Sequence, residues 1–142
     1  MSYYPISVTA ATLTLNKPTH EGVVVVANRA AGITFTLPAS SGSGCKYTVV
    51  VGTTITSNNL IIQVANSTDI MAGVALQAAD GGSTVNGWET GATDDTITMD
   101  GSTKGGVKGD RIELEDYASG VWHVRILGAA TGTEVTPFSS AV

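Results

Sequence analysis

The chain is poor in charged residues, which make up 13% of its 142 residues, against about 25% in typical soluble domains. Hydrophobic residues make up 42%, whereas disordered chains combine low hydrophobicity with high net charge. Disorder is therefore excluded as the explanation of the missing charge. Two explanations stay open: partner chains cover much of the surface, since interface cores are depleted in charge, or the chain is a β protein with a threonine-rich exterior.

Positive charge is especially scarce, and the formal net charge is −5. Binding of DNA or RNA needs a concentrated positive field that displaces counterions. The densest basic group is the pair Lys104 and Lys108, near Arg111, and Asp100 and Asp110 bracket this pair. We therefore expect no direct contact with nucleic acid.

Cysteine and long apolar runs are also nearly missing. Cys45 is the only cysteine, so a disulfide within the chain is impossible, and we expect Cys45 to point inward as a small apolar residue. No stretch approaches the roughly 18 apolar residues of a membrane-spanning helix. The N-terminus has neither the basic start nor the apolar run of a signal peptide. The sequence predicts synthesis in the cytoplasm and no membrane partner.

The residue patterns that carry catalysis do not occur. Only His20 and His123 could act as bases near neutral pH, and a metal site needs three or four converging ligands. The chain has neither a Gly-x-Ser-x-Gly nucleophile motif nor a phosphate-binding loop ending in Gly-Lys-Ser/Thr. The acidic residues near Asp94 lack the calcium-loop pattern. The sequence predicts no enzyme activity, no cofactor and no metal.

What the chain contains in quantity is the period-two alternation of β-strands, broken by turns rich in glycine and serine. Ile33, Phe35 and Leu37 alternate with threonines, and Pro38 should end that strand because proline cannot donate to a sheet ladder. Residues 39–44 then predict a turn, and residues 47–51 the returning strand of a hairpin. About nine such short strands predict an all-β, single-domain β-sandwich of jelly-roll type.

The predicted sandwich spans residues 7–127, between an N-terminal arm over residues 1–6 and an extended C-terminal tail over residues 128–142. Residues 77–94 form the longest predicted irregular segment. Aromatic residues and prolines on these segments are the candidate contacts, because exposed rings tend to dock on a neighbouring surface. We expect the N-terminal tyrosines to dock either on this chain or on a neighbouring subunit, and Trp88 to pack over a sheet edge. The candidate partner-binding residues are Tyr3, Tyr4, Pro5, Trp88, Pro137 and Phe138.

Five short segments carry a family resemblance. They are Thr36-Leu37-Pro38-Ala39, Gly87-Trp88-Glu89-Thr90-Gly91-Ala92, Gly109-Asp110-Arg111-Ile112-Glu113-Leu114, Gly120-Val121-Trp122-His123-Val124 and Ala130-Thr131-Gly132-Thr133-Glu134. Together, over residues 30–138, they resemble small all-β virion proteins of tailed bacteriophages, in particular head decoration (cement) proteins. The resemblance implies a non-enzymatic subunit, usually a homotrimer, bound to the major capsid protein. It would lie on the outer capsid surface of the virion after synthesis in the host cytoplasm, and stabilise the shell against DNA pressure.

Similar Leu-Pro, Gly-Asp and Gly-x-Trp signatures also occur in phage tail-fibre modules, so a tail-fibre or receptor-binding module is the alternative function. Such a module would need exposed aromatic residues, and Trp88 with Tyr117 would be its platform. An enzyme would instead need Asp94 or His123 in a pocket with other titratable groups.

Overall fold

The structure is a computed structural model that describes residues 4–142. Over this range it contains twelve strands and one four-residue helix, α1 (Lys17–His20), which confirms the all-β prediction. None of its helices has the length and apolar character needed to cross a membrane.

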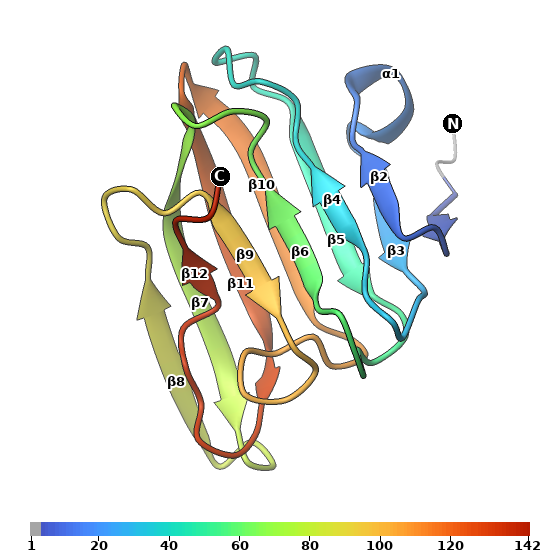
Figure 1. The fold of residues 1–142 in the computed structure, drawn as a ribbon, viewed down its shortest axis with the longest axis vertical. Helices are drawn as coiled ribbons and strands as arrows, with labels where there is room; N and C mark the ends of the chain where they lie inside the picture. Colours follow the sequence, from blue (N-terminus) through green and yellow to red (C-terminus); the bar gives the residue numbers. More distant parts are fainter. Residues whose placement is uncertain (1–3) are drawn as a thin grey trace.

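The strands form two sheets. The seven-stranded sheet has the order β1 (Ile6–Val8), β3 (Val24–Ala27), β5 (Lys46–Val51), β10 (Arg111–Ala118), β11 (Val121–Ala130), β7 (Ile70–Ala79) and β8 (Thr84–Glu89). The five-stranded sheet has the order β12 (Phe138–Ser139), β9 (Thr96–Met99), β6 (Leu60–Gln63), β4 (Thr34–Thr36) and β2 (Thr12–Thr14). In Figure 1 the five-stranded sheet lies over the seven-stranded one.

A single hydrophobic core joins the two sheets. Alternate residues of the strands are buried, as in β5, where Tyr47, Val49 and Val51 point inward. They belong to the same buried cluster as Phe35 of β4 and Ile62 of β6. Period-two patterning therefore places one face of each sheet in this shared core.

The jelly-roll part of the prediction is not confirmed. Jelly rolls are antiparallel, whereas five of the ten strand pairings here are parallel. The first six strands alternate between the sheets, so that β1, β3 and β5 pair in parallel in one sheet and β2, β4 and β6 in the other. From β1 to β6 the chain thus passes from one sheet to the other after every strand.

The predicted hairpin over residues 33–51 is wrong, because β4 and β5 lie in different sheets. The serine- and glycine-rich connection does not close a tight turn between them. Its backbone N–H groups and serine hydroxyls instead donate hydrogen bonds to the buried carboxylate of Asp116, at the end of β10. A long-range contact therefore determines the path of this loop.

Two other predicted boundaries differ from the structure. Residues 77–94 are not irregular throughout, because β7 and β8 form an antiparallel hairpin whose turn contains Asp80, Gly81 and Gly82 at positive φ. The strand β11 continues to Ala130, past the predicted domain boundary at residue 127. The C-terminal segment joins the five-stranded sheet through β12, which pairs with β9.

Four of the twelve acidic residues are buried, and hydrogen bonds from loops satisfy their carboxylates. Asp110, for example, accepts from the backbone N–H groups of Gly106, Val107 and Ala129. Its pKa is raised, because burial outweighs these hydrogen bonds. The buried set is Asp69, Asp95, Asp110 and Asp116. Charge that is already scarce in the sequence is therefore scarcer still at the surface.

Candidate interaction surfaces

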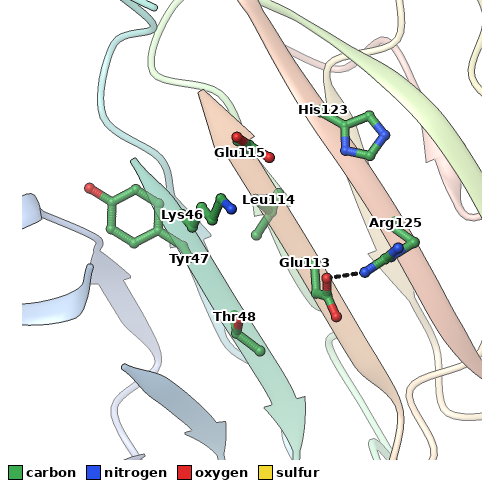
Figure 2. Close-up of a pocket in the computed structure, with 8 residues that line it drawn as sticks. All are labelled: Lys46, Tyr47, Thr48, Glu113, Leu114, Glu115, His123 and Arg125. Carbon is green, nitrogen blue, oxygen red and sulfur yellow. Dashed lines mark hydrogen bonds and ion pairs between the residues drawn. The ribbon is translucent and has the colours of Figure 1, made fainter. Parts of the chain in front are cut away.

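The outward face of the seven-stranded sheet divides into a charged half and an apolar half. In the charged half, strand register aligns Lys46 of β5 with Glu115 of β10 and His123 of β11. Two residues farther along the same strands, Glu113 of β10 stands beside Arg125 of β11. These side chains line a shallow depression of about 190 Å³, and Figure 2 shows them rising from three adjacent strands.

Glu113 forms ion pairs with two arginines of the charged half. Its carboxylate pairs with Arg125 at 2.5 Å and with Arg111 at 3.1 Å. The hydrogen bond from Arg125, supported by Arg111, lowers the pKa of Glu113. Tyr117 packs edge-on against His123, with 6.2 Å between the ring centroids. The result is a polar surface with both signs of charge interspersed.

The apolar half lies on β11, β7 and β8, and its Val74 stands between Arg125 of β11 and Glu89 of β8 at the border with the charged half. Leu127 and Leu76 are direct register partners, and Gly87 stands opposite Leu76 without a side chain to cover it. The exposed fractions are 40% for Val74, 45% for Leu76, 63% for Val85 and 52% for Leu127. These four residues are half of the eight exposed large hydrophobic residues in the described chain. We call them the apolar patch.

The apolar patch reaches the edge of the sheet at β8. Within the described residues β8 pairs only with β7, which leaves the backbone groups of its other edge without a strand partner. Natural edge strands are usually protected by lysine, proline or bulges. The β8 sequence Thr-Val-Asn-Gly-Trp-Glu has no lysine or proline, and its one charged side chain is Glu89 at the end of the strand. An apolar surface beside an open edge is a suitable site for another protein.

The outward face of the five-stranded sheet is different in character. Thr12 and Thr14 of β2 stand directly beside Thr34 and Thr36 of β4, and Thr98 of β9 stands beside an isoleucine of β6. The strand positions on this face carry no charge. The predicted threonine-rich exterior is therefore found on this sheet.

The structure places Trp88 in β8 on the inner side of the sheet, opposite the buried Ala75. Its indole Nε1–H donates to the side-chain oxygen of Gln77 at 3.2 Å, and its ring packs against the core. This confirms that Trp88 packs over a sheet edge. Tyr117 contacts His123 on the outward face, so the two aromatic rings do not form a common platform.

The predicted residues of the terminal arms separate into two groups. Tyr4 and Pro5 are exposed, Tyr4 by 82%, and Tyr3 lies outside the described residues. Pro137 and Phe138 are buried, and Phe138 pairs with Ile97 of β9. The tail is thus held at Phe138, as predicted, but on the chain's own core, so these two side chains are not free to bind a partner.

The titratable candidates are dispersed. His20 is buried in α1, where its Nδ1 accepts the backbone N–H of Asn16 at 3.0 Å and burial lowers its pKa. His123 is exposed on β11, and the Asp94 carboxylate accepts the N–H of Gly91 within its own loop. No group of three or more His, Cys, Asp or Glu residues within residues 4–142 is arranged to hold a metal ion.

A cavity of about 360 Å³ opens between α1 and the loop that follows β4. Its apolar wall includes Leu15, Cys45, Tyr47 and Trp122, all buried, which confirms the inward position predicted for Cys45. Burial raises the pKa of Tyr47 to about 12, with contributions from Cys45 and nearby carboxylates. Alternation predicts that Trp122 faces the core, but no pattern in the sequence predicts the cavity.

The apolar patch with its open edge, the threonine-rich face and this cavity are the candidate sites. The patch departs from an ordinary soluble surface, since large apolar side chains on three adjacent strands are exposed together. Comparisons with protein-family models, with curated proteins and with solved structures found no match for this chain.

Proposed function

We propose that this chain is a head decoration protein of a tailed bacteriophage, a non-enzymatic β-sandwich that binds the major capsid protein on the outer surface of the head. It acts as a homo-oligomer, a trimer, and stabilises the shell by protein–protein contacts. The observation that supports this proposal is the apolar patch beside the open edge of strand β8. Contiguous exposed apolar surface on a soluble protein marks an interaction site.

The surroundings of the patch fit a protein interface. Interfaces combine a dry apolar centre with a polar rim. Here the Arg125–Glu113 ion pair lies two residues along the strands from Leu127 and would form part of such a rim. Burial of the patch stabilises a complex by about 25 cal/mol per Å² of apolar area. Each contact can be modest, because a shell displays many copies of the same site and multiplicity raises the overall affinity.

The receptor-binding alternative has less support. It needs exposed aromatic residues that present one platform to a sugar or a receptor. Trp88 is half-buried with its indole N–H hydrogen-bonded to Gln77, and Tyr117 lies on the other face of the sheet. We therefore favour the decoration function.

Substitution of Leu127 by glutamate tests the proposal directly. In co-sedimentation with undecorated heads, we expect Leu127→Glu to bind about 30-fold more weakly than the wild-type protein, because a large apolar side chain buried in an interface contributes about 2 kcal/mol and the new carboxylate must be desolvated. Its melting temperature should stay close to the wild-type value, since Leu127 is exposed.

Thr12→Glu is the matched control, because it places the same charge on an exposed strand position of the other sheet. It should bind heads like the wild-type protein. Loss of binding in Thr12→Glu but not in Leu127→Glu would assign capsid binding to the threonine-rich face. Failure of the wild-type protein to sediment with heads would contradict the decoration function itself.

A further inference from the structure

The backbone groups at the open edge of β8 can be assigned residue by residue. Opposite residues of an antiparallel pair alternate between those that exchange hydrogen bonds with the partner strand and those whose N–H and C=O groups point away from it. The N–H of Thr90 donates to the carbonyl oxygen of Gly73 at 3.1 Å, in the register of the β7–β8 ladder. Counting from this pair, Val85, Gly87 and Glu89 direct their N–H and C=O groups away from β7.

The residues that carry these groups are accessible from outside. Val85, Gly87 and Glu89 are all exposed, and Figure 1 shows β8 at the margin of the seven-stranded sheet. A row of N–H and C=O groups without a strand partner is a template for another strand. Only an extended backbone repeats its own donors and acceptors at the same interval. An extended segment of a protein is therefore the occupant that this edge fits.

An added strand would continue both faces of the sheet. On the outward face its side chains would lie beside Val85, which belongs to the apolar patch. On the inward face they would lie beside Asn86 and Trp88, which are half-buried at this edge. Side chains that stand next to each other on adjacent strands stabilise a sheet. Apolar residues at the positions beside Val85 and Trp88 would therefore strengthen the pairing.

The charge around β8 has one sign. Residues 47–103, which include β7, β8 and β9, contain six acidic residues and no basic residue. Glu89 at the end of β8 and Asp80 in the turn before it are both exposed. Across the sheet from Glu89, basic charge first occurs at Arg125, two strands away. Lys104 lies on the inner side, where its carbonyl oxygen accepts a hydrogen bond from a β7 side chain. A segment that carries lysine or arginine complements this edge.

We propose that β8 accepts an extended, basic segment of the capsid partner as an eighth strand of the seven-stranded sheet, paired with Val85, Gly87 and Glu89. The proposal rests on the proposed function and specifies how the head is bound. Backbone hydrogen bonds form at the edge, and the apolar patch lies against the partner beside them. In strand addition the main-chain bonds supply affinity, and alternate side chains supply specificity.

Amide hydrogen exchange tests this contact residue by residue. Wild-type protein labelled with ¹⁵N is bound to undecorated heads, placed in D₂O, released into dimethyl sulfoxide to stop exchange, and compared by nuclear magnetic resonance with the free protein. The N–H groups of Val85, Gly87 and Glu89 should exchange about tenfold more slowly or more in the bound protein, because they gain acceptors. Those of Asn86 and Trp88 should change little, since they already bond to β7. Equal slowing of all five, or no slowing, would overturn the proposal.

Gly87→Pro removes one of the edge-facing N–H groups and leaves the bonds to β7 in place. Thr14→Pro is the matched control on β2, the edge strand of the other sheet. Leu15 donates to Thr36, the register partner of Thr14, so the N–H of Thr14 also points away from its neighbouring strand. Gly87→Pro should bind heads about tenfold more weakly, the loss expected for one hydrogen bond, and Thr14→Pro should bind like the wild-type protein.

Circular dichroism and urea denaturation establish that both proline variants are folded. Equal binding of heads by folded Gly87→Pro and Thr14→Pro would overturn strand addition at β8. Where Gly87→Pro does not fold, the alternating exchange pattern of the wild-type protein decides. A Gly87→Pro variant that lowers the oligomeric state of the free protein would also overturn the proposal, because the edge would then be occupied by a second copy.

Charge reversal tests the basic character of the segment. Glu89→Lys should bind heads about fivefold more weakly, since it replaces an attractive surface pair by a repulsive one. Glu21→Lys changes the net charge equally at an exposed position beside α1, on the far side of the molecule from β8 (Figure 1), and should bind like the wild-type protein. Equal binding by the two variants would contradict a basic segment.

The outcomes separate this contact from the decoration function. Heads that bind the wild-type protein and Gly87→Pro equally would exclude only the added strand, and the apolar patch would remain the site of contact. Failure of the wild-type protein to bind heads would contradict the decoration function and the added strand together.

Discussion

Substitution of Gly73 by alanine is expected to destabilise the protein by about 3 kcal/mol or more, the upper part of the range for single substitutions. Gly73 lies in β7, directly opposite Val124 of β11. A Cβ atom at this position would lie 1.8 Å from the carbonyl oxygen of Val124 and 2.8 Å from its carbonyl carbon. Because these are backbone atoms, no side-chain rotation relieves the clash, and the parallel β7–β11 ladder must separate locally.

Gly87→Ala is the matched control on the neighbouring strand. Both glycines lie in strands of the same sheet, but the nearest atom to a Cβ on Gly87 is Leu76 Cδ2 at 3.5 Å, an ordinary contact. Alanine is also a better strand residue than glycine, which loses more conformational freedom on folding. Urea denaturation should therefore show Gly87→Ala within about 0.5 kcal/mol of the wild-type protein. Equal stability of the two variants would mean that β7 and β11 lie farther apart than the structure places them.

The strands with clean alternation could be predicted from the sequence alone. Ile33 to Leu37, Thr96 to Met99 and Val121 to Ile126 contain the predicted strands β4, β9 and most of β11. Their inward faces are also the predicted ones, since Phe35, Ile97 and Trp122 are buried. Period-two patterning is local, so it is visible without knowledge of the partners.

Strand pairing could not be predicted in the same way, because it depends on residues far apart in the chain. β4 precedes β5, yet β4 pairs with β2 and β6, and β5 with β3 and β10. The strand β8 is not predictable from the sequence either, because the sequence of β7 and β8 is rich in alanine and glycine and lacks a clear alternation. Only the register shows that β8 continues the seven-stranded sheet.

The apolar patch is not predictable from the sequence for a related reason. Leu76 and Leu127 are far apart in sequence, and each alone is an ordinary exposed residue; their parallel register makes them neighbours. The sequence left open whether low charge reflects covered surface or a threonine-rich exterior. The structure shows threonines on one sheet and the apolar patch on the other. Buried aspartates, whose positions no local pattern indicates, remove further charge from the surface.

The second large effect is expected at Asp116, the carboxylate that holds the loop after β4. It accepts hydrogen bonds from the hydroxyls of Ser40 at 2.6 Å and Ser43 at 2.7 Å. The backbone N–H groups of Ser41, Gly42 and Ser43 donate to it at 3.0 to 3.1 Å. We expect Asp116→Ala to destabilise the protein by about 3 kcal/mol at neutral pH, because several donors lose a charged acceptor at once. The exposed Glu21, substituted by glutamine, is the control and should have little effect.

The pH dependence of the unfolding free energy shows whether the charge of Asp116 is responsible for this stabilisation. Burial alone would raise the pKa of Asp116, but the hydrogen bonds from Ser40, Ser43 and Ser41 outweigh it and hold the pKa well below the ordinary range. The folded protein therefore binds this proton more weakly than the unfolded chain. Asp116 contributes its full stabilisation above the unfolded pKa of about 4, and this contribution is lost as the pH falls toward the folded pKa.

Asp116→Asn isolates that contribution, because the amide keeps the shape of the side chain and cannot titrate. Asp110 contributes with the opposite sign, since burial raises its pKa, so the pH profile of the wild-type protein alone mixes several groups. The difference in unfolding free energy between the wild-type protein and Asp116→Asn, measured by urea denaturation, should be constant from pH 7 to about pH 5 and shrink below about pH 4. A difference that stays constant down to pH 2 would show that Asp116 holds the loop through shape and not through its charge.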